Sequence, residues 1–348
     1  MDLRNKFMNL VAPPAALFFL CLVLPPLYFL KLFFYLFSAL FPQNLRQKVV
    51  LITGASSGIG ENLAYQYAKK GASLALVARR EGRLRETANR SRELGSPDVL
   101  VIQADVSNPD DCRRFIETTV SHFGRLDHLV NNAGISCVCL FEEVSNITSF
   151  SQVMDINFWG LIYPTHFAIP QLKKSRGRIV VTSSAASWLP MPRMSFYNAS
   201  KAALTSFYET LRVELGREVG VTIATPGLTE SEMTQGKMLT KEGHLQMDQE
   251  TTDTQVGPFP VVYAEAYAKA VVEAACRGQR YLTVPAWFRE VHVCRMVAPE
   301  VVDWFFRLLF MARPGGEKEP LSKKLFDATG TKEMLYPSSQ QSSEIKQD

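Results

Sequence analysis

The chain has 348 residues, 47% of them apolar, and its 38 basic and 34 acidic side chains give a formal charge of +4. These figures exclude a disordered chain, a collagen-like chain and a strongly basic nucleic-acid-binding protein. The excess charge lies entirely in residues 1–48, which hold five basic residues and one acidic residue, so this segment must be considered on its own.

The N-terminal segment carries an apolar run long enough for a membrane. Of the 32 residues from Leu10 to Phe41, 26 are apolar and only Lys31 is charged. The run lacks the polar face of a soluble core helix, and it exceeds the roughly 20 residues that a spanning helix needs. It is too long for a cleaved signal peptide, whose apolar run is about 7–15 residues. We therefore predict a membrane anchor over residues 1–45.

Two proline pairs, Pro13-Pro14 and Pro25-Pro26, interrupt this run. Each proline removes a backbone donor and clashes with the preceding turn, so the second pair divides the run into two arms. At ~1.5 Å per residue, neither arm crosses a bilayer core of about 30 Å. Basic residues flank both ends, as in a hairpin whose ends share the cytosolic face. The prediction is a hairpin that dips into the lipid; a kinked single span and a buried soluble helix are the alternatives.

From residue 46 onward, short apolar runs alternate with stretches long enough for helices. The expected strands are Val49–Thr53, Ser73–Ala78, Val99–Gln103, Leu129–Asn131, Arg178–Ser183, Val221–Thr225 and Tyr281–Val284. This alternation predicts an α/β fold, a Rossmann-type doubly wound parallel sheet of about seven strands. We expect one domain over residues 46–312 with a lid insertion near 228–260, then a polar, disordered tail over 313–348.

A glycine-rich turn follows the first expected strand. Its sequence is Thr53-Gly54-Ala55-Ser56-Ser57-Gly58-Ile59-Gly60. Glycines let the backbone approach a pyrophosphate closely, and the N-terminus of the following helix offers free N–H groups to an anion. The turn favours a nucleotide site, and an ordinary strand–helix connection is the alternative.

Two arginines, Arg79 and Arg80, follow the second expected strand. NAD-selective sites usually place an acid there, on the ribose 2′-hydroxyl, whereas arginine accepts a 2′-phosphate. The sequence therefore predicts NADP rather than NAD as the cofactor. The alternative is that both arginines are only solvated residues at the start of a helix.

Tyr197 and Lys201 are four residues apart in a helical stretch, so their side chains share one face. A nearby positive charge favours phenolate and moves the pKa of Tyr197 toward a range useful for acid–base chemistry. Ser184 ends the preceding strand and can orient a carbonyl or alcohol oxygen. Such a pair is frequent by chance on a helix surface, so the motifs around it must show whether it is functional.

The context is a family resemblance. Together with Asp105-Val106, Asn131-Asn132-Ala133-Gly134 and Pro226-Gly227, these motifs stand in the order and spacing of the short-chain dehydrogenases/reductases. Residues 45–290 resemble the hydroxysteroid dehydrogenases of that family. The resemblance implies that Tyr197 is the catalytic acid/base, that Ser184 polarises the substrate oxygen and that Asn157 anchors a water in a proton relay. Lys201 would hold the nicotinamide ribose and lower the pKa of Tyr197.

The resemblance also implies the cofactor-binding residues. They are Gly54, Ser56, Ser57, Gly58, Ile59, Gly60, Arg79, Arg80, Asp105, Asn131, Ala133, Tyr197, Lys201, Pro226 and Ser231. Asp105 would contact adenine and Asn131 would help to build the central nucleotide pocket. The family commonly follows Pro-Gly with an aliphatic residue pair and then a threonine, whereas this chain continues from Pro226-Gly227 with Leu228-Thr229-Glu230-Ser231. Ser231, or less readily Thr229, would therefore bind the nicotinamide amide.

A short-chain dehydrogenase behind a Pro-kinked apolar segment resembles the steroleosins, the plant oil-body sterol dehydrogenases. That resemblance implies NADP-dependent interconversion of steroid or sterol hydroxyl and ketone groups on the 11β- or 17β-hydroxysteroid dehydrogenase pattern. It implies a location at the lipid-droplet (oil-body) surface and the ER membrane, with the catalytic domain facing the cytosol. A homodimer is expected from the same resemblance. The alternatives are a sterol-binding lipid-droplet protein with minor catalysis and a retinol-type reductase.

Apolar loops predict where a flat apolar substrate would lie. We expect it between the Ile135–Leu140 loop, the Trp188–Met194 loop and the 228–260 insertion. The run Val301–Met311 is expected either to face the membrane or to pack on the body or a partner subunit. The six cysteines form no C-x-x-C pair and the five histidines are scattered, so no metal site is expected. The chain beyond residue 48 has no net charge, which argues against nucleic-acid binding.

Overall fold

The computed structural model describes residues 2–257, 259–311, 320–329 and 336–337. The chain divides into two compact units, residues 1–43 and residues 44–348.

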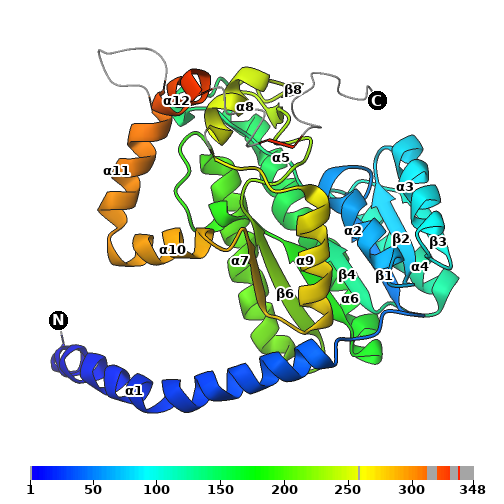
Figure 1. The fold of residues 1–348 in the computed structure, drawn as a ribbon, viewed down its shortest axis with the longest axis horizontal. Helices are drawn as coiled ribbons and strands as arrows, with labels where there is room; N and C mark the ends of the chain where they lie inside the picture. Colours follow the sequence, from blue (N-terminus) through cyan, green and yellow to red (C-terminus); the bar gives the residue numbers. More distant parts are fainter. Residues whose placement is uncertain (1, 258, 312–319, 330–335, 338–348) are drawn as a thin grey trace. The chain divides into compact units, whose positions relative to one another are not determined.

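The first unit is one helix, α1 (Leu3–Leu40), with all four prolines inside it. The expected hairpin of two arms is therefore wrong for the structure, and Figure 1 shows α1 curving without a reversal of direction. A proline removes one helical hydrogen bond and bends a helix, but the surrounding turns can continue through it. By length and composition, α1 could cross a membrane.

The second unit is built on a seven-stranded sheet in the order β3-β2-β1-β4-β5-β6-β9. All neighbouring strands are parallel. The strands are β1 (Val49–Thr53), β2 (Ser73–Ala78), β3 (Val99–Gln103), β4 (His128–Asn131), β5 (Arg178–Thr182), β6 (Gly220–Pro226) and β9 (Tyr281–Val284). The predicted α/β fold with about seven parallel strands is confirmed.

Alternation along β1 creates two cores, one on each face of the sheet. Val50 and Ile52 pack with side chains of α2, α3 and α9, whereas Val49 and Leu51 pack with side chains of α4, α6 and α7. This is the doubly wound arrangement, with helices on both faces (Figure 1). The helices are α2 (Gly58–Ala68), α3 (Glu81–Glu93), α4 (Pro109–Phe123), α6 (Gly160–Ser175), α7 (Ser195–Leu215) and α9 (Ala264–Cys276).

An insertion between β6 and α9, here called the lid, covers residues 228–260. It contains the antiparallel pair β7 (Lys237–Leu239) and β8 (Leu245–Met247) and the helix α8 (Gln249–Val256). The other short elements are η1 (Phe141–Glu143), η2 (Ile147–Phe150), α5 (Ser151–Met154), η3 (Asp155–Trp159) and η4 (Ala185–Ser187).

In the described part of the chain, three helices follow β9, namely α10 (Phe288–Val297), α11 (Pro299–Phe310) and α12 (Leu321–Thr329). The sequence predicted a disordered tail from residue 313, but α12 is helical. Its Ser322 is buried and donates a hydrogen bond to the Thr254 carbonyl of the lid. This buried contact explains why a polar stretch is ordered there. The other residues of the predicted tail, apart from 320 and 336–337, lie outside the described part of the chain.

Candidate active site

The glycine-rich turn joins β1 to α2, and its glycines are required by close backbone approach. A Cβ atom on Gly60 would lie 2.1 Å from the Gly54 carbonyl oxygen, and one on Gly54 would lie 2.8 Å from the Ala133 Cα. Gly54 also has a positive φ of 66°. No side chain caps the N-terminus of α2 at Ser57, so its backbone N–H groups are available to an anion.

A cavity of about 530 Å³ opens beside this turn and is here called the turn cavity. It lies where the strand order reverses between β1 and β4, the position at which open α/β sheets bind ligands. Most of the predicted cofactor residues line it: Gly54, Ser56, Ser57, Gly58, Ile59, Gly60, Arg79, Arg80, Asp105, Ala133, Tyr197, Lys201, Pro226 and Ser231.

Asn131 is the exception among the predicted cofactor residues. It is fully buried and is absent from the lining of the turn cavity. Its amide donates hydrogen bonds to the Leu161 carbonyl and to the hydroxyls of Thr165 and Tyr208, so it ties β4 to α6 and α7. Its neighbour Asn132 lines the cavity instead. Successive side chains along an extended backbone point to opposite faces, so Asn132 faces the cavity when Asn131 faces the core.

The two arginines after β2 occupy different surroundings. Arg80 donates to the Ser57 hydroxyl at 2.8 Å and pairs with Glu232 of the lid at 2.7 Å. Arg79 is more exposed, and its guanidinium lies 3.9 Å from the Asp105 carboxylate. Arg80 is therefore the arginine fixed against the glycine-rich turn.

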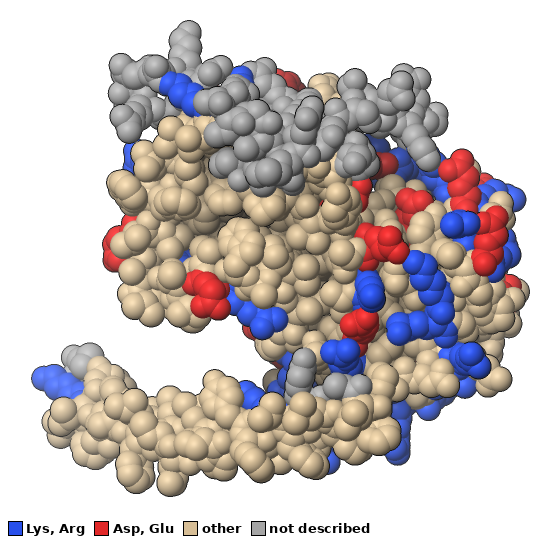
Figure 2. Space-filling view, in the orientation of Figure 1, with Lys and Arg blue, Asp and Glu red and all other residues tan. Residues whose placement is uncertain are grey.

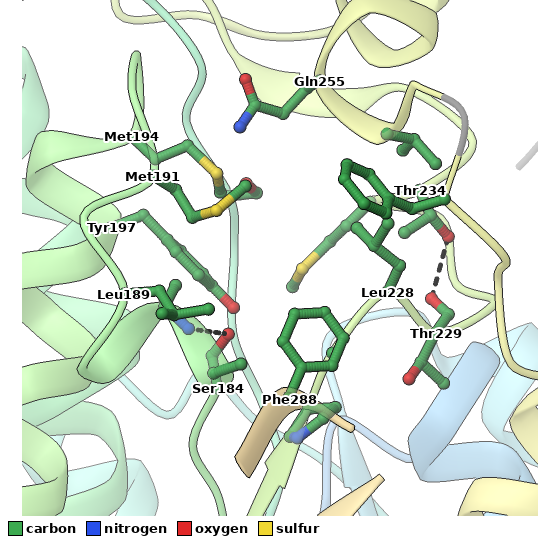
Figure 3. Close-up of a pocket in the computed structure, with 18 of the residues that line it drawn as sticks. Ser184, Leu189, Met191, Met194, Tyr197, Leu228, Thr229, Thr234, Gln255 and Phe288 are labelled. Atoms are coloured by element: carbon green, nitrogen blue, oxygen red, sulfur yellow. Dashed lines mark hydrogen bonds between the residues drawn. The ribbon is translucent and has the colours of Figure 1, made fainter. Parts of the chain in front are cut away.

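Tyr197 and Lys201 lie in the first two turns of α7, and both side chains are buried. Lys201 Nζ donates to the Thr182 carbonyl at 3.1 Å at the end of β5. A second cavity, of about 190 Å³ and here called the apolar cavity, adjoins the turn cavity. Lys201 lines only the turn cavity and Ser184 only the apolar one, whereas Tyr197 lines both. Figure 3 shows the Tyr197 hydroxyl pointing toward the Ser184 hydroxyl.

Asn157 is held in η3, a π-helical turn before α6, and its side chain is fully buried. Its amide oxygen accepts from the Ile135 N–H at 2.8 Å, and its amide nitrogen donates to the Ile135 carbonyl at 2.9 Å and to Ser200 at 3.1 Å. A Cβ atom on Gly134 would lie 3.2 Å from the Asn157 amide oxygen and 3.6 Å from Lys201 Nζ. Asn157 therefore lies beside the lysine and fixes the loop after β4.

All three predicted segments contribute to the apolar cavity: Ser136 and Val138; Leu189, Met191 and Met194; and Leu228, Thr229, Ser231, Met233, Thr234, Met238, Gln255, Val256 and Phe259. Figure 3 shows Leu189, Met191, Met194, Leu228 and Phe288 surrounding the Ser184 and Tyr197 hydroxyls. The sequence interpretation missed the residues from the region of α10 and α11, namely Trp287, Phe288, Val291, Phe305, Phe306 and Phe310.

Comparison with known proteins shows to which family the chain belongs. The model of the short chain dehydrogenase family matches residues 48–242. The chain is 54% identical over 349 residues to "11-beta-hydroxysteroid dehydrogenase A" of Sesamum indicum and to "11-beta-hydroxysteroid dehydrogenase 1A" of Arabidopsis thaliana, covering all of each.

The chain belongs to the short-chain dehydrogenase/reductase family. It is therefore an oxidoreductase. A short-chain dehydrogenase from Burkholderia phymatum solved in complex with NAD is similar to the chain, at 26% identity and a TM-score of 0.66. That match covers 74% of this chain and 96% of the other. An alcohol dehydrogenase from Thermococcus sibiricus complexed with 5-hydroxy-NADP matches at 26% identity and a TM-score of 0.56, over 68% and 94%.

Burial dominates the electrostatics of this dehydrogenase's site. It raises the pKa of Tyr197 to about 12, while a hydrogen bond with Ser184 acts in the opposite direction. Burial also lowers the pKa of Lys201 to about 8. The lowered pKa that the helix spacing predicted for Tyr197 is therefore not found, because desolvation of the phenolate outweighs the hydrogen bond with Ser184.

Thr229 and Ser231, the two residues considered for the nicotinamide amide, lie differently in the dehydrogenase. Ser231 lines both cavities, and Thr229 lines only the apolar one. The Thr229 hydroxyl is buried without a hydrogen-bond partner among the described residues, and the Thr229 carbonyl accepts from Thr234 at 2.9 Å (Figure 3). Ser231 thus reaches the junction of the two cavities and Thr229 does not.

Proposed function

We propose that this chain is an NADP-dependent dehydrogenase that interconverts hydroxyl and ketone groups of steroids or sterols. The observation that carries the proposal is the position of Tyr197, whose side chain lines both the turn cavity and the apolar cavity. The names of the relatives from Sesamum indicum and Arabidopsis thaliana support a hydroxysteroid as the substrate class. The lining of the apolar cavity suits a flat apolar molecule with one oxygen at the Tyr197 end.

The turn cavity fits a nicotinamide dinucleotide. A Cβ atom on Gly54 or Gly60 would clash with neighbouring backbone, so these glycines allow the tight turn, and the uncapped N-terminus of α2 suits a pyrophosphate. Asp105 would contact the adenine end, and Arg80, with Arg79 nearby, would accept the 2′-phosphate. Ser231 would hold the nicotinamide amide and Lys201 the adjoining ribose. The bound nicotinamide supplies or takes up the hydride of the reaction.

The protein's part of the chemistry is proton transfer. With a pKa of about 12, Tyr197 holds its proton at neutral pH and can donate it as a ketone oxygen becomes an alkoxide. The Ser184 hydroxyl, close to Tyr197, would hold that same oxygen. The Lys201 ammonium adds positive charge on the cofactor side, and Asn157 fixes the adjoining loop where a relay water would bind.

We further propose that residues 1–45 anchor the enzyme to the lipid-droplet monolayer or the ER membrane with the catalytic domain facing the cytosol. The 38 residues of α1 extend about 57 Å, well beyond a bilayer core of about 30 Å. On the second unit, Val297, Val301 and Trp304 are largely exposed on α10 and α11. Figure 2 shows few charges there, whereas charged side chains gather over α2 and α3. This surface suits lipid or the second subunit of a homodimer.

A panel of hydroxysteroids, ketosteroids and retinoids, assayed with both cofactors on the full chain in lipid, tests the proposal. We expect turnover of a steroid pair with NADP(H) preferred over NAD(H). Tight steroid binding without turnover would favour the binding-protein alternative. Preferred turnover of retinoids would replace the substrate class.

A further inference from the structure

We propose that Glu232 of the lid is a latch residue that reports which dinucleotide is bound. Its carboxylate holds Arg80 when no 2′-phosphate is present, and a 2′-phosphate takes over that guanidinium and releases the lid. The inference rests on the proposed function, in which Arg80 receives the 2′-phosphate.

Arg80 connects the lid to the glycine-rich turn through one guanidinium. One of its terminal nitrogens lies 2.7 Å from Glu232, and the other donates to Ser57 at 2.8 Å. The two charged side chains are 26% and 28% exposed, and both line the turn cavity. An anion bound beside Ser57 would therefore meet Glu232 as a direct competitor for Arg80.

Lys237, at the start of β7, allows a phosphate to replace Glu232 on Arg80 without leaving Glu232 unpaired. Its ammonium lies 3.1 Å from the second oxygen of Glu232. Burial alone would raise the pKa of Glu232, but Arg80 and Lys237 together hold that pKa below its usual range, so the carboxylate stays ionised. When Arg80 binds a phosphate, Glu232 keeps its ion pair with Lys237, so neither half-buried charge is left unpaired.

The residues on either side of Glu232 lie against two glycines that line the turn cavity. A Cβ atom on Gly58 would lie 3.3 Å from the Ser231 Cα, and one on Gly134 would lie 3.7 Å from the Met233 methyl group. Ser231 and Met233 also line the apolar cavity. Release of Glu232 would therefore loosen a segment that both cavities share, and cofactor choice would be coupled to the substrate side.

The Arg80–Glu232 pair also limits the preference for the phosphorylated cofactor. A dinucleotide with a free 2′-hydroxyl leaves the Arg80–Glu232 pair intact. A 2′-phosphate must displace a carboxylate of like charge, which lowers its affinity. Removing the charge of Glu232 should therefore improve binding of the phosphorylated cofactor alone.

Calorimetric titration with adenosine 2′,5′-bisphosphate and with AMP tests this on the full chain, because the two probes differ only in the 2′-phosphate. We expect Glu232→Gln to strengthen binding of the bisphosphate by about tenfold and to leave AMP within about twofold. Glu218→Gln is the matched control, since it neutralises the exposed partner of Lys173 outside both cavities and should change neither affinity. In the wild type, the bisphosphate should speed hydrogen exchange over residues 230–239, and AMP should not.

The outcomes separate the two claims. If the bisphosphate binds no better than AMP to the wild type and Arg80→Met changes neither affinity, the proposed NADP preference fails and the latch fails with it. If the bisphosphate binds better through Arg80 but Glu232→Gln brings no gain, the latch alone is overturned. If the bisphosphate leaves the rate of hydrogen exchange over residues 230–239 unchanged in the wild type, the latch is also overturned, and that measurement needs no variant.

Discussion

Lys201 Nζ lies 5.7 Å from the centroid of the Tyr197 ring on the buried face of α7. Burial acts on both groups, keeping the phenol protonated and making the ammonium easier to deprotonate. Lys201 and Tyr197 therefore lose their protons in different ranges of pH.

This separation predicts the pH dependence of ketone reduction. Lys201 is charged below its pKa of about 8 and neutral above it. We expect kcat to fall as the pH rises through about 8, because the positive charge beside the site is lost while Tyr197 stays protonated to about 12. A pH–rate profile checks this, and Lys201→Met should remove the descending limb. A rate that stays constant well above pH 8 would contradict the assignment.

Gly60→Ala tests the glycine-rich turn. Its methyl group would meet the Gly54 carbonyl oxygen at 2.1 Å, so we expect loss of dinucleotide binding of at least about 100-fold and a lower Tm. Gly82→Ala is the matched control, because nothing lies within 4 Å of the added Cβ. That helical substitution should stabilise the protein by about 0.5–1 kcal/mol. Equal behaviour of the two variants in dinucleotide titration and thermal melting would refute the packing argument.

Met191→Trp tests the apolar cavity as the substrate site. The larger side chain would fill space that Met191 and its neighbours enclose, so the KM for a steroid should rise about tenfold or more, with the KM for NADPH unchanged. Met296→Trp is the control, because Met296 is 64% exposed on α10 and lies outside the cavity. Steady-state kinetics with both substrates separates the two effects. A steroid KM that does not move would place the substrate elsewhere.

The anchor is tested by placing charge within α1. Arginine at Leu20 and Leu22 should move the full chain from the membrane fraction to the soluble fraction, because each buried charge costs about 2.5–3.5 kcal/mol in a bilayer core. Leu3→Arg, at the first residue of α1, should leave the distribution unchanged. Fractionation of cells or droplets measures this. Retention of the double variant would mean that another surface holds the protein.

The sequence predicted most of the fold because its signals are local. Each strand run is bounded by helical stretches, and the observed strands Val49–Thr53, Ser73–Ala78, Val99–Gln103 and Tyr281–Val284 match the expected ranges. Spacing on one helix likewise placed Tyr197 with Lys201. The long apolar helix was predictable from composition, but its continuity through Pro25-Pro26 was not, since a proline pair signals a bend and a break equally.

The features that the sequence did not predict depend on contacts between distant segments. The sequence left open whether the run Val301–Met311 faces the membrane or packs on the body, and it did not predict that Phe306 and Phe310 line the apolar cavity while Trp304 is exposed. The Arg80–Glu232 pair joins residues 152 positions apart. The raised pKa of Tyr197 follows from burial, which the spacing of two residues on a helix does not report.

The most direct test of the account compares wild type and Tyr197→Phe for NADPH-dependent reduction of a ketosteroid, with both proteins saturated by cofactor. Tyr197 is the one polar group that we assign to proton transfer at the junction of the two cavities. We predict that kcat falls about 10³-fold, within the range for loss of a general acid, while the Kd for NADPH stays within about twofold. A variant that keeps its kcat within a few fold would contradict the account.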